Sequence, residues 1–147
     1  MLDWVVILTP VLALGALLLL GFAGCDVVFG LTKITSVEIV VRVPTSLGVT
    51  EILYRCDKPD GNSTQSLDDH PVAESTDGAD ALFRHQFGKV ETGAWTARVR
   101  VTVNGGTPMQ ATAQGMFTLD GSDDTVAATF QASVSAGVLT VAFVGAS

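Results

Sequence analysis

The amino-acid sequence predicts a mainly β protein, with a single N-terminal apolar α-helix in residues 1–31 and an antiparallel β-sandwich in residues 32–147. Two observations predict this organisation. The 22 residues from Trp4 to Cys25 carry no charged side chain. After residue 31, apolar and polar residues alternate with the period of two that half-buried β-strands require. A chain of 147 residues has room for one domain and this appendage, and not for two full cores.

The apolar stretch is long enough to cross a membrane. As a helix rising about 1.5 Å per residue, Trp4 to Cys25 would extend about 33 Å. A β domain of this size cannot surround such a helix in its core, so we expect a transmembrane or signal helix. Small residues would allow a neighbouring helix to approach closely in lipid, and the candidates for this packing are Ala13, Gly15, Ala16, Gly21 and Gly24.

The stretch ends in Leu17-Leu18-Leu19-Leu20-Gly21-Phe22-Ala23-Gly24-Cys25-Asp26. This run resembles the lipobox of bacterial lipoproteins. The resemblance implies cleavage before Cys25, a diacylglycerol on its sulfur and, through Asp26, retention in the inner membrane. The run departs from the lipobox at Phe22, where leucine is usual, and residues 1–3 carry an acid and no Lys or Arg. A retained helix and a lipidated Cys25 are therefore alternatives.

The charges near the helix give a weak orientation signal. Lys33 and Arg42 follow the helix, and counted alone they would leave the β domain in the cytoplasm. The lipobox-like cysteine, the sandwich pattern typical of surface proteins and the sequon Asn62-Ser63-Thr64 favour the opposite side. We expect the β domain on the extracytoplasmic side of the cell membrane, in the periplasm or at the cell surface.

The strands are predicted from alternation and from turn residues. Val37, Ile39 and Val41 share one face of a strand, and Asn104-Gly105-Gly106 suits a tight hairpin. The predicted strands are 37–43, 49–56, 81–87, 95–103, 110–119, 125–134 and 138–144, with the acidic stretch 57–80 as a long loop in which 72–74 is a candidate edge strand. Seven or eight strands at this spacing indicate a sandwich.

One segment adds a resemblance to this pattern. Glu91-Thr92-Gly93-Ala94-Trp95-Thr96-Ala97-Arg98-Val99 resembles the F-strand signature of immunoglobulin-like domains, acid-x-Gly-x-Tyr-x-Cys-x-Val. Trp95 replaces the tyrosine and Ala97 the cysteine, so the resemblance implies neither the tyrosine-corner bond nor the inter-sheet disulfide. It implies fold only, and a fibronectin-like or bacterial Ig-like sandwich fits equally well.

Catalytic motifs are absent from the sequence, which has no GxSxG, HExxH, Walker loop or GxGxxG. His70 lies in the acidic stretch, and His85 lies on a predicted strand between Phe83 and Phe87. The simplest interpretation is a loop histidine and an outward-pointing strand histidine, neither of which is a base or a ligand. We expect no enzymatic activity and no cofactor.

Two acidic turns could offer oxygen ligands to calcium. They are residues 57–62 and 120–124, and in the second the candidate ligands are Asp120, Asp123 and Asp124. Because tight turns also select Asp, Asn and Gly, turn formation is the simpler explanation of both segments.

Charge bears on the partners. Arg98 and Arg100 point outward with Thr96 and Thr102, so they form either a contact face for an acidic partner or a solvated face. With a net charge of −7 and Lys and Arg scattered singly, the chain lacks the basic stripe that nucleic acids require. We expect a membrane and other protein subunits, in a hetero- or homo-oligomer, as partners.

The sequence thus favours a non-catalytic, membrane-anchored structural or accessory subunit, with its helix packed among neighbouring helices and its sandwich bracing the outer face of an assembly. One alternative is a bacterial lipoprotein, lipidated at Cys25, whose sandwich binds a ligand or an ion. A second alternative is a subunit of a surface filament or virion with helices in its core.

Overall fold

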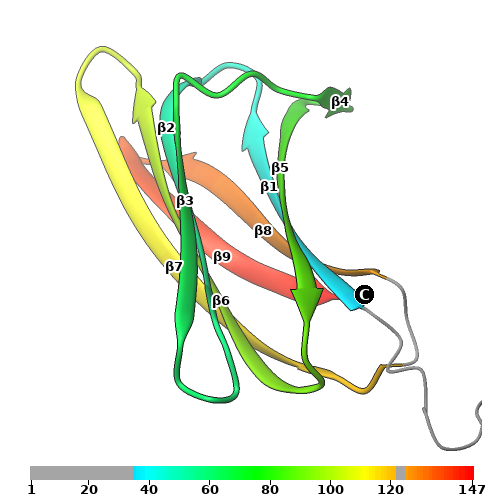
Figure 1. Cartoon of the computed structure of the whole chain (residues 1–147). Coiled ribbons are helices and arrows are strands. Elements are labelled where there is room, and N and C mark those ends of the chain that lie inside the picture. The colour runs from blue at the N-terminus through cyan, green and yellow to red at the C-terminus, as the bar shows by residue number, and fades with distance from the viewer. Residues whose placement is uncertain (1–34, 122–124) are drawn as a thin grey trace, which may run out of the picture. The chain divides into compact units, whose positions relative to one another are not determined.

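A computed structural model describes residues 35–121 and 125–147. They form nine strands in two sheets (Figure 1). In chain order these are β1 (Thr35–Pro44), β2 (Gly48–Asp57), β3 (Ser63–Asp69), β4 (Ser75–Asp77), β5 (Asp80–Val90), β6 (Gly93–Asn104), β7 (Pro108–Leu119), β8 (Thr125–Ser135) and β9 (Val138–Ala146). The described residues include no helix of the length and hydropathy needed to span a bilayer. The predicted helix at 1–31 lies outside the described residues.

One sheet has the order β4-β5-β1-β8-β9 and the other β3-β2-β6-β7. The predicted mainly β, two-sheet architecture is confirmed for the described residues. Two details were predicted wrongly. The stretch 57–80 is not a long loop, because it contains β3 and β4, and the short strand falls at 75–77 rather than 72–74. The fold is also not wholly antiparallel, because β1 pairs with β8 in parallel.

The core lies between the sheets and follows the predicted alternation. Val37, Ile39, Val41 and Val43 of β1 are fully buried. They meet the inward residues of the opposite sheet, above all Trp95, Ala97, Val99, Val101 and Val103 of β6. Trp95, Tyr54 and Phe130 are the largest fully buried side chains. These interdigitated residues fix which face of each strand points outward, because a slip of one residue would expose the whole apolar set.

Trp95 fixes the start of β6. Its indole Nε1 donates a hydrogen bond to the carbonyl oxygen of Glu91, four residues upstream, at 2.8 Å. A tyrosine corner makes the same kind of backward bond through its hydroxyl. The tryptophan therefore makes a corner bond of the kind that the F-strand resemblance, with its tyrosine replaced, did not imply for this chain. Ala97 pairs in register with Cys56, which is a buried free thiol.

The edge strands β7 and β9 of the two sheets lie close together along one flank (Figure 1). The ring of Phe143 in β9 lies directly on the backbone of Gly115 in β7, where a Cβ atom would overlap it. The same ring also contacts Phe130, with centroids 5.3 Å apart. This flank is therefore closed by an aromatic side chain packed on a glycine.

Candidate functional site

The outer face of the sheet β3-β2-β6-β7 carries three arginines, which we call the arginine cluster: Arg55, Arg98 and Arg100. Strand alternation places them there, because Tyr54 and Cys56 on either side of Arg55 are buried in the core. In the register of β2 and β6, Arg55 lies opposite Arg98 and Leu53 opposite Arg100. The structure places Arg98 and Arg100 outward, as predicted, and adds Arg55, which sequence analysis missed.

Two carboxylates lie against the arginine cluster. Asp57 bridges two of the arginines, because Arg55 Nε donates to its Oδ1 at 2.7 Å and Arg98 Nε lies 3.0 Å from its Oδ2. Arg100 Nη2 donates to Oε1 of Glu51 at 2.9 Å. Three guanidinium groups thus share two acids, and the cluster keeps one net positive charge in a chain of net charge −7.

The guanidinium groups border a shallow hollow of about 200 Å³. The residues that line it are the three arginines, Leu53, Val99 and Thr112. Apolar side chains stand farther out on the flanking strands. Leu67, opposite Leu53 on β3, is 55% exposed, and Met116, opposite Thr96 on β7, is 79% exposed. This face therefore combines cationic donors with exposed apolar surface, a composition that protein interfaces favour.

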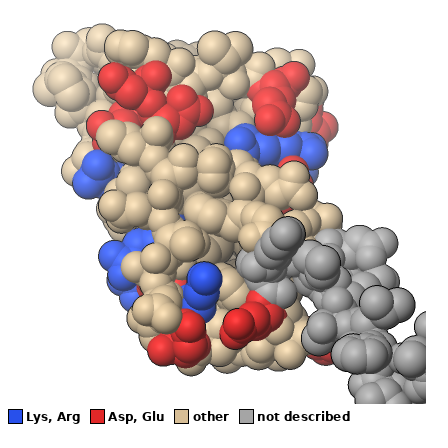
Figure 2. Space-filling model, in the orientation of Figure 1, with Lys and Arg blue, Asp and Glu red and all other residues tan. Residues whose placement is uncertain are grey.

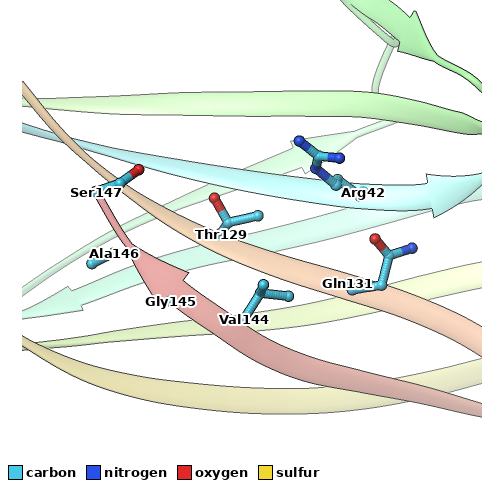
Figure 3. A pocket seen from close by; sticks show the side chains of 7 residues that line it. All are labelled: Arg42, Thr129, Gln131, Val144, Gly145, Ala146 and Ser147. Atoms are coloured by element: carbon cyan, nitrogen blue, oxygen red, sulfur yellow. The ribbon is translucent and has the colours of Figure 1, made fainter.

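A larger hollow, of about 400 Å³, lies on the other sheet. Figure 3 shows Arg42 of β1, Thr129 and Gln131 of β8, and Val144 of β9 around it. Two of its polar side chains have acidic partners, since Arg42 Nη1 donates to Oδ2 of Asp77 at 2.9 Å and Gln131 Nε2 donates to Oδ2 of Asp80 at 3.1 Å. The Nε of Arg42 is buried and has no hydrogen-bond partner in the described part of the chain. The hollow is open and shows no nucleophile beside a base among the described groups that line it.

His85 was predicted to point outward, and this prediction is wrong. The imidazole lies between the sheets, stacked on Tyr54 with centroids 5.2 Å apart and in edge contact with Phe87 at 4.6 Å. Burial lowers the pKa of His85, and the nearby Asp68 opposes this effect only partly. Burial also raises the pKa of the Tyr54 hydroxyl. The ring therefore serves as a packing element on the inward face of β5.

His70 occupies the loop position predicted for it. Its backbone N–H donates to the carbonyl oxygen of Thr50 at 3.0 Å, and its φ of 63° marks a tight turn. The imidazole is exposed, and its Nε2 lies 3.9 Å from Oδ1 of Asp69. This arrangement is that of a surface turn.

The described parts of the two acidic turns considered for calcium, residues 57–62 and 120–121, lie at the same end of the sandwich. Pro59 of one turn packs on Gly93, and Gly121 of the other packs near Thr92. Asp60 accepts bonds from the backbone N–H of Asn62 at 2.9 Å and from its side chain at 2.8 Å, which lowers the pKa of Asp60. Among residues 35–121 and 125–147, no three His, Cys, Asp or Glu side chains are grouped so as to hold a metal ion. Of the calcium candidates, Asp120 is described, whereas Asp123 and Asp124 lie outside the described residues.

Charged groups on the visible face of the molecule are interleaved. Figure 2 shows basic groups beside acidic ones, with broad uncharged surface between them and no continuous basic stripe on that face. The lipidation candidate Cys25 and the helix-packing candidates Ala13, Gly15, Ala16, Gly21 and Gly24 lie outside the described residues. Comparisons with protein-family models, with curated proteins and with solved structures find no match to this chain.

Proposed function

We propose that the chain is a non-catalytic, membrane-anchored structural or accessory subunit, whose extracytoplasmic β-sandwich braces a larger membrane or surface assembly. The observation that carries the proposal is the charge-free stretch from Trp4 to Cys25 placed before a well-packed β domain. Exposure of such a stretch to water is unfavourable, so we expect it to be buried in lipid or among other apolar helices. The sandwich then stands at the membrane as a rigid module.

The strand order supports an immunoglobulin-like form of this module. The orders β4-β5-β1 and β3-β2-β6-β7 correspond to strands D-E-B and C′-C-F-G of immunoglobulin sandwiches. In this alignment β6 is strand F, which agrees with the corner position of Trp95. The parallel strand β8 occupies the position beside strand B that strand A takes in those domains. Such sandwiches serve widely as spacers and contact modules, although fold alone does not assign a role.

Two alternatives also place the sandwich outside the cytoplasm. The first has a different anchor, and the second has a different kind of assembly. The run ending in Cys25 and Asp26 favours a lipoprotein, in which a diacylglycerol replaces the helix as anchor and the sandwich binds a ligand or an ion. The uninterrupted apolar stretch is also compatible with a filament or virion whose helices form the core. Intact mass separates the first alternative, because lipoprotein maturation adds a diacylglycerol to Cys25 and cleaves off residues 1–24.

The anchoring is tested by placing a charge in the apolar stretch. The full chain is expressed with Leu14→Lys, at the centre of the stretch, or with the matched control Leu14→Ile, and membranes are washed at alkaline pH. A lysine at the centre of a membrane helix costs about 2.5–3.5 kcal/mol, so we expect the lysine variant to leave the membrane fraction and the control to remain. The wild-type protein, extracted in mild detergent, should carry partners in fixed ratio. A wild-type chain that stays a soluble monomer without detergent would overturn the proposal.

A further inference from the structure

We propose that the arginine cluster is a docking surface for an acidic segment of a different protein subunit, whose carboxylates enter the hollow between Leu53 and Thr112. This inference rests on the proposed role as a subunit and identifies the face that holds the partner. It also goes beyond the prediction for Arg98 and Arg100, because it depends on Arg55 and on the hollow, which only the folded register creates.

The first support is the like-charged pair across the strands. Arg55 and Arg98 are directly opposed, an arrangement that destabilises a sheet unless negative charge lies between the two groups. Asp57 supplies part of that charge from one side. A carboxylate arriving from outside would supply the remainder.

The second support is a surplus of hydrogen-bond donors. Three guanidinium groups carry about fifteen N–H donors, whereas two carboxylates offer about eight lone-pair sites. A ligand can reach the exposed part of these donors, since the side chains of Arg55, Arg98 and Arg100 are 40%, 44% and 37% exposed. Planar guanidinium groups bind carboxylates in a bidentate manner, so the surplus donors define the chemistry of the ligand. It is a protein segment that presents side-chain carboxylates.

The third support is the apolar surface on both sides of the cluster. Leu67 and Met116 stand out from β3 and β7, on strands that flank the cluster. Interfaces commonly place arginine and methionine within an apolar surround. We therefore expect the partner segment to lie across the strands and to flank its carboxylates with apolar side chains.

A second copy of this chain fits the face less well than a different protein. In a two-fold symmetric dimer whose axis passes through the hollow, the arginine cluster would face another arginine cluster. Two chains of net charge −7 also repel one another at a distance. Nucleic acid is disfavoured by the same net charge and by the small extent of the cationic surface.

The test uses the full chain in its native membrane, with a photo-cross-linking amino acid at Thr112 beside the hollow. The matched control carries the cross-linker at Thr140, an exposed position on the other sheet. We expect Thr112 alone to give a cross-link to a partner peptide that contains at least two Asp or Glu residues. A cross-link to a second copy, a partner peptide without acids, or equal products at both positions would each overturn the inference.

The charge dependence is tested with Arg98→Gln combined with Arg100→Gln. The control is Arg84→Gln, because Arg84 on the other sheet is 41% exposed, close to the 44% of Arg98. We expect partner recovery to fall at least tenfold in the double variant and to stay unchanged in the control, with the same thermal midpoint for every chain after solubilisation. Arg98→Lys checks folding independently, because it keeps the charge and should keep the partner in part.

The two proposals fail differently. If the wild-type chain carries no partner in fixed ratio, the proposed role as a subunit fails. If the wild-type chain carries a partner that the double variant retains at the same level while Thr112 gives no cross-link, the role stands and the docking surface is wrong.

Discussion

Gly115→Ala should destabilise the sandwich because it disturbs the closed flank between β7 and β9. A Cβ atom at position 115 would overlap the ring of Phe143, and the ring cannot withdraw freely because it also contacts Phe130. Overpacking of this kind costs about 1–3 kcal/mol. We expect the free energy of unfolding of residues 32–147, measured by urea titration and far-UV circular dichroism, to fall by that amount.

The matched control is Gly88→Ala in β5, where the added Cβ meets no atom within 4 Å. This substitution should leave stability unchanged or raise it by about 0.5–1 kcal/mol, because alanine loses less backbone entropy than glycine in a strand. The stability losses of Gly115→Ala and Phe143→Leu should not add in the double variant, because the smaller side chain at position 143 makes room for the methyl group. Equal stability of the two alanine variants, or strict additivity with Phe143→Leu, would refute the reasoning.

Three further predictions concern buried groups of the same fragment. Trp95→Phe removes the bond to the carbonyl of Glu91 and part of the core volume, so urea titration should show a loss of about 2–3 kcal/mol; a loss below 0.5 kcal/mol would contradict the corner role. Burial lowers the pKa of His85 from 6.5, so the unfolded chain binds the proton more tightly than the folded chain. The free energy of unfolding should therefore fall as the pH drops below 6.5. His85→Gln should make this pH dependence less steep in urea titrations at a series of pH values. Burial raises the pKa of the Cys56 thiol to about 12, so in the full chain with Cys25→Ser a thiol reagent should label Cys56 only after unfolding, and rapid labelling of the folded protein would contradict this.

The strands with one apolar face could be predicted from sequence, and those without one could not. β6 alternates without a break from Trp95 to Val103, and the structure buries each inward residue of that set. β3 has only polar residues on its inward face, because it lies at the edge of its sheet, where that side is only partly covered, and Leu67, its one apolar residue, points outward. The alternation of apolar and polar residues therefore did not indicate a strand in this segment. The parallel pairing of β1 with β8 joins segments far apart in the chain, and local patterns contain nothing that reports it.

The error at His85 has a different origin. Phe83, His85 and Phe87 are spaced two residues apart, so the alternation itself places the imidazole on the same side as the two phenylalanines. The outward prediction gave the polarity of histidine more weight than the period. In the fold, stacking on Tyr54 compensates for burial of the ring. For an aromatic residue with a titratable group, the period was the better guide.

The arginine cluster shows how much of a site depends on register. Arg98 and Arg100 were predicted to face outward from a single strand, but a pair on one strand is compatible with any solvated sheet. Arg55 joins them only because β2 pairs with β6 in one register, which places it opposite Arg98. The shared carboxylate and the hollow arise from that pairing, so no local segment of the sequence could predict them.

Arg55→Thr distinguishes a docking role of the arginine cluster from a structural one. Exposed ion pairs contribute about 0–1 kcal/mol, and removal of Arg55 also relieves its opposition to Arg98 while Asp57 keeps one partner. Threonine suits an outward strand position, so the free energy of unfolding of residues 32–147 should change by less than about 1 kcal/mol. If the cluster served mainly to hold β2 against β6, the loss would exceed that range, whereas a docking face would lose partner recovery from membranes with the fold intact.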